Sequence, residues 1–246
     1  MIISHEHSFI FIKTHKTAGS SIEAALSPHV GDDAVVTQLL PDEPPEHNSR
    51  NHRGLFNPIP DVVAAFRAGH DRPRRRGAGV FEPLLRLRRR QRYWEHMSLG
   101  AALRHSPREV GSYYRFCFER NPWDKVLSIW FWSGRQAGRQ RTMDGFERWL
   151  DMPDTPRGLR SDWHLYSLGG KLAVDFVGRF EDLEQDLRVA MRPCGVDTSI
   201  LEIPHHKKAP RSPDVQISQR ASRRIEEMFH REIEAFGYEP PSGLIA

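Results

Sequence analysis

The sequence predicts an α/β domain with a central parallel sheet flanked by helices. Residues 9–12 and 113–119 are short, mainly apolar runs, and each passes within a few residues into a segment with helix-start signals. Such runs are typical of strands buried on both faces of a parallel sheet. The 246 residues are enough for one domain with a full core, so we expect a single domain over 1–246.

The first run, Phe9–Ile12, leads through a turn, Thr14–Ser21, into a helical segment, Ile22–Leu26. Ser20 and Glu23 have the spacing of a capping box, which predicts that Ser20 caps the helix. The simplest alternative to a functional loop is an ordinary strand-to-helix turn, in which the serines only cap the helix and Lys16 is solvated.

The same turn has the chemistry of an anion site. A strand that feeds a helix start directs several backbone N–H groups and the positive end of the helix dipole toward one spot, which suits phosphate or sulfate. Gly19 permits close backbone approach, Ser21 adds a hydroxyl donor beside Ser20, and Lys16 supplies a cation.

The second run, Tyr113–Glu119, continues directly into a predicted helix. Asn121 is a suitable N-cap and Pro122 fits the first helical position. Arg120 then lies at the strand end and Ser128 about two turns along the helix.

Arg120 and Ser128 could therefore face one bound anion. Asp124, three residues after the predicted cap, could instead hold Arg120 in a structural ion pair.

Two segments resemble a known family. Thr14–Ser21 resembles the 5′-phosphosulfate loop of sulfotransferases, and Phe116–Ser128 resembles their 3′-phosphate motif. The ordered pair is similar to the branch that uses 3′-phosphoadenosine 5′-phosphosulfate (PAPS) and includes carbohydrate sulfotransferases of the heparan 2-O type and bacterial relatives. Val174–Leu183 and Ile233–Tyr238 resemble later segments of that branch, whereas 30–92 is largely unmatched.

The resemblance implies a P-loop-like sulfotransferase fold, PAPS as sulfuryl donor, no metal, and an acceptor hydroxyl on a saccharide or glycolipid. It implies that the 5′-phosphosulfate is held by Lys16, Thr17, Ala18, Gly19, Ser20 and Ser21, and the 3′-phosphate by Arg120, Ser128 and Lys207 or Lys208. Lys125 replaces a common arginine of the motif, and we expect it to be peripheral.

Sulfuryl transfer requires charge stabilisation on the leaving phosphate oxygen and a base for the acceptor proton. Lys16 is the candidate for the first role. His96 is preferred as the base because bacterial relatives often carry a histidine just before the helix that leads to the second motif. The other candidates, which stay open, are Glu23, His15, His52 and His70.

Residues 41–92 form a Pro/Arg-rich insertion, with nine arginines between Arg72 and Arg92. A solvated surface segment is the simplest interpretation. A strip that binds an acidic glycan, nucleic acid or an anionic membrane is the alternative, and it would make the chain a polyanion-binding protein on a nucleotide-binding fold. A P-loop kinase is disfavoured because Gly-x-x-x-x-Gly-Lys is absent.

The formal charge of +4 and a pI near 9.3 are compatible with an anionic cofactor. Cys117 and Cys194 lack metal or redox spacing, and no long apolar stretch or signal peptide is evident, so we expect a cytoplasmic, bacterial enzyme without nucleic-acid partners.

Residues 180–191 and 225–236 carry apolar stripes, the second ending at Gly237, and both are predicted core helices.

Overall fold

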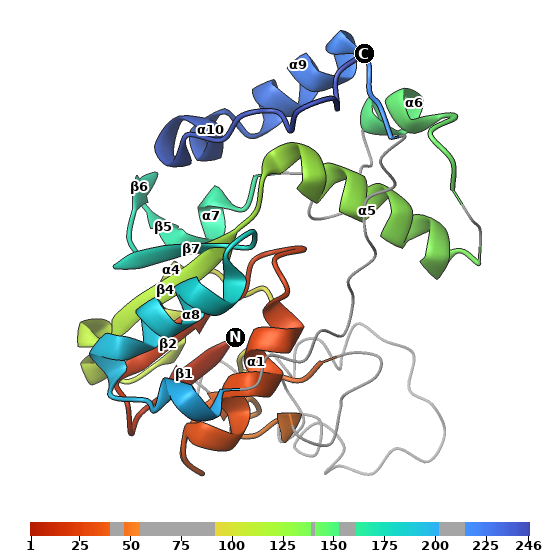
Figure 1. The fold of residues 1–246 in the computed structure, drawn as a ribbon. Coiled ribbons are helices and arrows are strands. Elements are labelled where there is room, and N and C mark those ends of the chain that lie inside the picture. The colour runs from red at the N-terminus through yellow and green to blue at the C-terminus, as the bar shows by residue number, and fades with distance from the viewer. Residues whose placement is uncertain (40–46, 55–91, 139–140, 153–160, 202–214) are drawn as a thin grey trace, which may run out of the picture.

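The computed structural model describes residues 1–39, 47–54, 92–138, 141–152, 161–201 and 215–246 (Figure 1). Its main sheet has the strand order β3-β1-β2-β4-β7. The strands are β1 Ile2–Ser4, β2 Phe9–Ile12, β3 Val35–Val36, β4 Tyr114–Glu119 and β7 Phe176–Arg179, and a separate hairpin joins β5 Ser167–Leu168 to β6 Lys171–Leu172.

The described ranges contain helices on both faces of this sheet and beside it. They are α1 Gly19–Leu26, α4 Leu99–His105, α5 Pro122–Gln136, α6 Phe146–Leu150, α7 Trp163–Tyr166, α8 Leu183–Met191, α9 Gln219–Met228 and α10 His230–Phe236. Short 3-10 turns cover Ser27–His29, Arg108–Ser112, Arg192–Cys194 and Thr198–Ile200. The predicted α/β class is thus confirmed.

The parallel part of the sheet is β2-β4-β7, as the two apolar runs predicted. β1 pairs antiparallel with both β2 and β3, so within the described strands of this sheet it runs opposite to the rest. Ile12 pairs with Cys117 in the parallel register. The segments that follow β2 and β4 therefore emerge side by side at one edge of the sheet.

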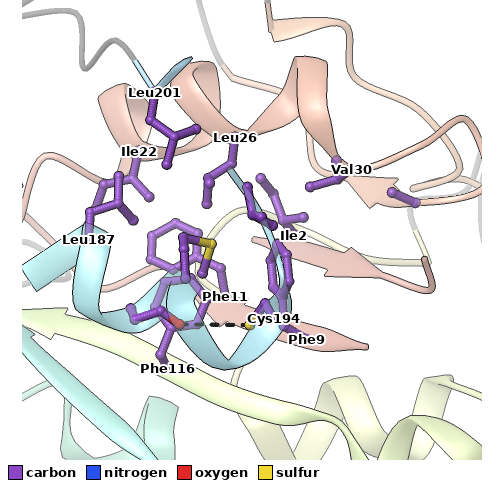
Figure 2. Packing of buried hydrophobic residues seen from close by; sticks show 14 of the residues in the cluster. Ile2, Phe9, Phe11, Ile22, Leu26, Val30, Phe116, Leu187, Cys194 and Leu201 are labelled. Atoms are coloured by element: carbon purple, nitrogen blue, oxygen red, sulfur yellow. Dashed lines mark hydrogen bonds between the residues drawn. The ribbon is translucent and has the colours of Figure 1, made fainter. Parts of the chain in front are cut away.

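The strand residues alternate between two apolar layers, as period-2 geometry requires. One layer joins the sheet to α1 and α8, and Figure 2 shows Phe9, Phe11 and Phe116 facing Ile22 and Leu187 there. The other layer joins the opposite face to α4 and α7 through residues such as Ile10, Ile12, Cys117, Leu99 and Leu165. Both faces are covered, which explains the uninterrupted apolar runs.

A third apolar cluster lies beside the sheet, between α5, α6 and α9 (Figure 1). The predicted stripe over 225–236 supplies Ile225 and Phe229 to this cluster, but the segment forms two helices that break at Phe229. Gly237 ends α10 with a φ of 63°, as predicted for a C-cap.

Of the two predicted helix N-caps, one is confirmed and one is wrong. The Asn121 side chain accepts a hydrogen bond from the backbone N–H of Trp123 at 3.2 Å, with Pro122 at the first position of α5. At α1, however, the cap position is Ala18, which makes no side-chain cap hydrogen bond. Ser20 lies inside the helix, and the Lys13 ammonium donates to its hydroxyl at 3.1 Å, so the Ser20–Glu23 capping box does not form.

Candidate functional site

The turn after β2 has an unusual backbone conformation. Lys16 and Ala18 both have φ near 60°, in the left-handed region that non-glycine residues rarely adopt. Alternation of right- and left-handed residues directs successive N–H groups into one concavity, and the first N–H groups of α1 have no acceptor within the helix. The backbone of the loop Thr14–Ser21 is therefore compatible with a bound anion, and the loop contains no acidic residue.

The ends of β2 and β4 are tied together at this loop. The Thr14 hydroxyl donates to the carbonyl of Phe118. Arg120, which follows β4, donates from Nη1 to the carbonyl of Lys16 at 3.4 Å, and its guanidinium lies 4.2 Å from the centre of the Phe180 ring. The two predicted motifs thus meet in space.

Arg120 retains unused hydrogen-bonding capacity. Its buried Nε has no hydrogen-bond partner among the described residues. Burial lowers the pKa of Arg120 from its ordinary value, and Asp124 and Glu181 oppose that shift. A buried guanidinium with an unused donor fits an anionic group such as a phosphate.

One face of α5 also borders the loop. The Lys16 ammonium lies 5.0 Å from the centre of the Trp132 ring, a cation–π distance. Ser128 is four residues before Trp132, so both lie on the same helix face. The half-buried Ser128 is thus placed on the side of α5 that faces Lys16.

Two candidate bases lie against each other. The imidazole rings of His15 and His96 are stacked, with centroids 3.8 Å apart and planes 16° from parallel. Nδ1 of His96 is 3.0 Å from the carbonyl of Lys13 and must donate to it, because a carbonyl only accepts. In its neutral form His96 therefore keeps Nε2 as an acceptor, the arrangement a general base needs.

The surroundings of His96 favour the neutral ring. Burial, and the nearby His15 and Lys13, lower the pKa of His96 from its ordinary value of 6.5 to about 4, although Glu95 acts in the opposite direction. His96 is thus unprotonated at neutral pH and able to accept a proton.

The buried Lys13 contacts the start of α1 and the segment before α4. The Lys13 ammonium donates to Glu23 at 2.8 Å and also binds Glu95 and the Ser20 hydroxyl. A Cβ on Gly19 would lie 2.6 Å from Lys13 Cγ, so the glycine makes room for this side chain. The glycine predicted to admit a ligand thus also admits Lys13.

A second buried ion pair lies under His15. The Lys125 ammonium is fully buried and donates to Asp162 Oδ2 at 2.7 Å and Glu119 Oε2 at 2.9 Å. Asp162 in turn accepts from the backbone N–H and from Nδ1 of His15, both at 2.7 Å. The expectation that Lys125 is peripheral is wrong. Its buried ammonium joins the carboxyl group of Glu119, at the end of β4, to that of Asp162, at the start of α7.

The two carboxylates around Lys125 respond differently to burial. Burial raises the pKa of Glu119 to about 7, with Lys125 opposing the shift. Burial would also raise the pKa of Asp162, but Lys125 and His15 hold it below its ordinary value. Asp162 therefore carries the charge that balances Lys125, whereas burial favours the protonated form of Glu119.

The structure brings most of the predicted site residues to one edge of the sheet and leaves out a few. The loop residues Lys16, Thr17, Ala18, Gly19, Ser20 and Ser21 lie beside Arg120 and His96 through the contacts above. Glu23 is fully buried and paired with Lys13, and His52 is buried where its carbonyl binds the N–H groups of Arg92 and Tyr93. Lys207, Lys208, His70 and most of the 41–92 insertion, including the arginines from Arg72 to Arg90, fall outside the described residues.

Sequence reasoning missed Asp162, Glu95, Lys13 and Trp132. Asp162 stands in no motif, and its bond to His15 spans 147 positions, so no local signal could reveal it. Glu95 and Lys13 adjoin predicted elements, but charged residues at such positions are usually solvated.

Comparison with known proteins shows the family of the chain. A profile of the sulfotransferase family matches residues 1–239, and the chain belongs to that family. An uncharacterized protein of Archaeoglobus fulgidus is 33% identical over 91 residues, which cover 34% of this chain and 69% of that protein. No solved structure matches the chain.

The remaining observations concern metals, thiols and membranes. Cys117 and Cys194 are buried and unpaired. Within the described ranges, no cluster of three or more His, Cys, Asp or Glu side chains could hold a metal, and no helix combines the length and apolar character needed to cross a bilayer. His5 Nδ1 lies 3.0 Å from the Tyr113 hydroxyl, and the two ring nitrogens of His7 lie near the carbonyls of Cys194 and His29.

Proposed function

We propose that this sulfotransferase moves a sulfuryl group from PAPS to an acceptor hydroxyl, on a saccharide or glycolipid. The observation that carries the proposal is the contact between Arg120 and the Lys16 carbonyl, because it joins the phosphosulfate-like loop to the 3′-phosphate-like motif. Two anion-binding elements at the ends of adjacent parallel strands suit a nucleotide with phosphates at both positions.

The residues present fit such a donor. The concave loop Thr14–Ser21 would hold the 5′-phosphosulfate through backbone N–H groups and the hydroxyls of Ser20 and Ser21. Arg120, with its unused Nε, and Ser128 would hold the 3′-phosphate. PAPS supplies an activated sulfur–oxygen bond.

In the proposed reaction the acceptor oxygen forms a bond to sulfur while the bond from sulfur to the phosphate oxygen breaks. Lys16 stabilises the negative charge that develops on that phosphate oxygen. His96 takes the acceptor proton at Nε2, since its Nδ1 is committed to the Lys13 carbonyl. The products are a sulfated acceptor and 3′-phosphoadenosine 5′-phosphate.

The state of the two cysteines supports a cytoplasmic location for the enzyme. Cys117 and Cys194 are free thiols, as is usual in a reducing compartment. Burial raises the pKa of both thiols, which keeps them unreactive.

A transfer assay with radiolabelled PAPS and a panel of saccharide and glycolipid acceptors tests the function. Wild type should label at least one acceptor, and Lys16→Ala should lower turnover about 10²–10³-fold, as for loss of one group that stabilises developing charge. Lys171→Ala is a matched control, because Lys171 is an exposed lysine of the β5-β6 hairpin. Equal turnover of wild type and Lys16→Ala would contradict the role of Lys16.

A further inference from the structure

The strongest unassigned feature is the buried chain of contacts that runs from Glu119 through Lys125 and Asp162 to His15. It rests on β4, α5 and the start of α7, and it ends at the loop residue directly before Lys16. The proposed reaction makes no use of Asp162 or Lys125, although both are almost fully buried.

Asp162 fixes His15 in two ways at once. One carboxylate oxygen accepts the His15 backbone N–H and the other accepts Nδ1, each at 2.7 Å. Backbone and ring are thereby locked together at the point where the chain enters the left-handed conformation of Lys16, whose φ is 60°. A conformation of this kind persists only where the surroundings hold it.

The bond to Asp162 also determines which nitrogen of His15 carries the proton. A carboxylate accepts, so Nδ1 donates and Nε2 of the neutral ring stays available. The His15 ring is stacked on His96 at 3.8 Å, so its position limits where the His96 ring can lie. Asp162 thus acts on two histidines and one loop without touching any reacting atom.

We propose that Asp162, anchored by Lys125, is a positioning residue of the transfer site that holds the His15–His96 stack and the start of the loop in the orientation for transfer. This inference rests on the proposed function. The charged groups that face the stack are Asp162 and, through it, Lys125 and Glu119 on the His15 side, with Lys13 and Glu95 on the His96 side.

Asp162→Asn and Glu119→Gln form a matched pair. Each replaces one of the two carboxyl groups that accept from the Lys125 ammonium with an isosteric amide, and the other carboxyl group stays in contact with the ammonium. Only Asp162 contacts His15. Both substitutions perturb the contacts of Lys125, but only Asp162→Asn removes the partner of His15. A positioning role should therefore change the His15 and His96 rings in Asp162→Asn and leave them unchanged in Glu119→Gln.

The readout that does not depend on activity is nitrogen-15 NMR of the histidine side chains, with His15→Gln and His96→Gln used for assignment. Wild type and Glu119→Gln should show a protonated, carboxylate-bonded Nδ1 in His15. Asp162→Asn should lose that signal and shift the resonances of His96. Unchanged His15 and His96 signals in Asp162→Asn would overturn the proposal.

The kinetic readout separates kcat from KM. Asp162→Asn should lower kcat between about tenfold and a hundredfold, the scale at which slight misplacement of reacting groups slows a reaction. The acceptor KM should change little, and Glu119→Gln should keep kcat within about twofold of wild type. Equal kcat in the two variants would overturn the proposal. Wild type without any transfer would instead refute the proposed function, and the NMR would still decide whether Asp162 holds the two rings.

Discussion

The rings of His15 and His96 lie face to face, 3.8 Å apart and 16° from parallel. His15 belongs to the loop after β2, and His96 to the segment before α4, so this contact joins two parts of the site that are distant in sequence. Two stacked cationic rings would repel, and this repulsion adds to burial in keeping His96 neutral. The stack thus favours a ring that can accept a proton.

His96→Ala should lower kcat about 10²–10⁴-fold, the usual contribution of a general base. Affinity for 3′-phosphoadenosine 5′-phosphate should stay within about threefold of wild type, because nothing in the proposed arrangement places His96 on a phosphate. Steady-state kinetics and calorimetry measure the two quantities. His105→Ala is the control, since His105 binds the Arg92 carbonyl away from the stack. Unaltered turnover in His96→Ala would remove it as the base.

Arg120→Ala should weaken binding of 3′-phosphoadenosine 5′-phosphate about tenfold or more, because a charge-assisted contact to the 3′-phosphate is lost. Arg179→Ala is a close control. In the backbone register of the parallel strands β4 and β7, Arg179 lies opposite Glu119. Its guanidinium, however, donates to the Phe236 carbonyl and lies 5.0 Å from the centre of the Tyr238 ring. If the two variants bind equally well by calorimetry, Arg120 is not a phosphate ligand.

Glu119 gives the stability of the fold a specific pH dependence. Its pKa is raised from 4.5 to about 7, so between these values the folded state binds more protons than the unfolded state. The free energy of unfolding contributed by Glu119 therefore falls as pH rises through this window.

Glu119→Gln removes that contribution, so the stability of the variant minus that of wild type should increase from pH 4.5 to pH 7. Urea unfolding at several pH values measures the difference. The contributions of His96 and Asp162 are common to both proteins and largely cancel. A difference that stays flat, or that decreases with pH, would contradict the assignment.

Ala18→Gly should stabilise the protein by about 0.5–1 kcal/mol, because glycine adopts a φ of 60° without the clash that a Cβ causes. Ala25→Gly, in the interior of α1, should instead destabilise by about 1 kcal/mol or more through helix entropy and lost packing. Thermal or urea unfolding measures both variants. If Ala18→Gly does not stabilise the protein, the left-handed conformation of Ala18 costs little free energy.

Local patterns were sufficient for the parts of the fold that depend on local physics. The apolar runs located β2 and, to within one residue, β4, and Asn121 with Pro122 located the start of α5. The Ser20 cap was wrong, because the left-handed Ala18 starts α1 earlier and the Ser20 hydroxyl binds Lys13 instead.

The supporting residues of the site were beyond such patterns. Lys125 was expected at the periphery because it replaces a common arginine of the motif and lacks that residue's forked geometry. The carboxyl groups of Glu119 and Asp162 instead converge on it from β4 and the start of α7. Similarly, His15 gave no sign of its bond to Asp162, since that contact exists only after the chain has folded. Motifs locate the residues that face a ligand, whereas only tertiary structure shows what holds them.

Calorimetric titration of the purified protein with 3′-phosphoadenosine 5′-phosphate, beside ATP and 5′-AMP, tests the central claim most directly. The joined Lys16 loop and Arg120 motif predict micromolar binding of the bisphosphate and at least about tenfold weaker binding of the other two nucleotides, which lack a 3′-phosphate. No binding of the bisphosphate, or equal binding of all three nucleotides, would contradict the account.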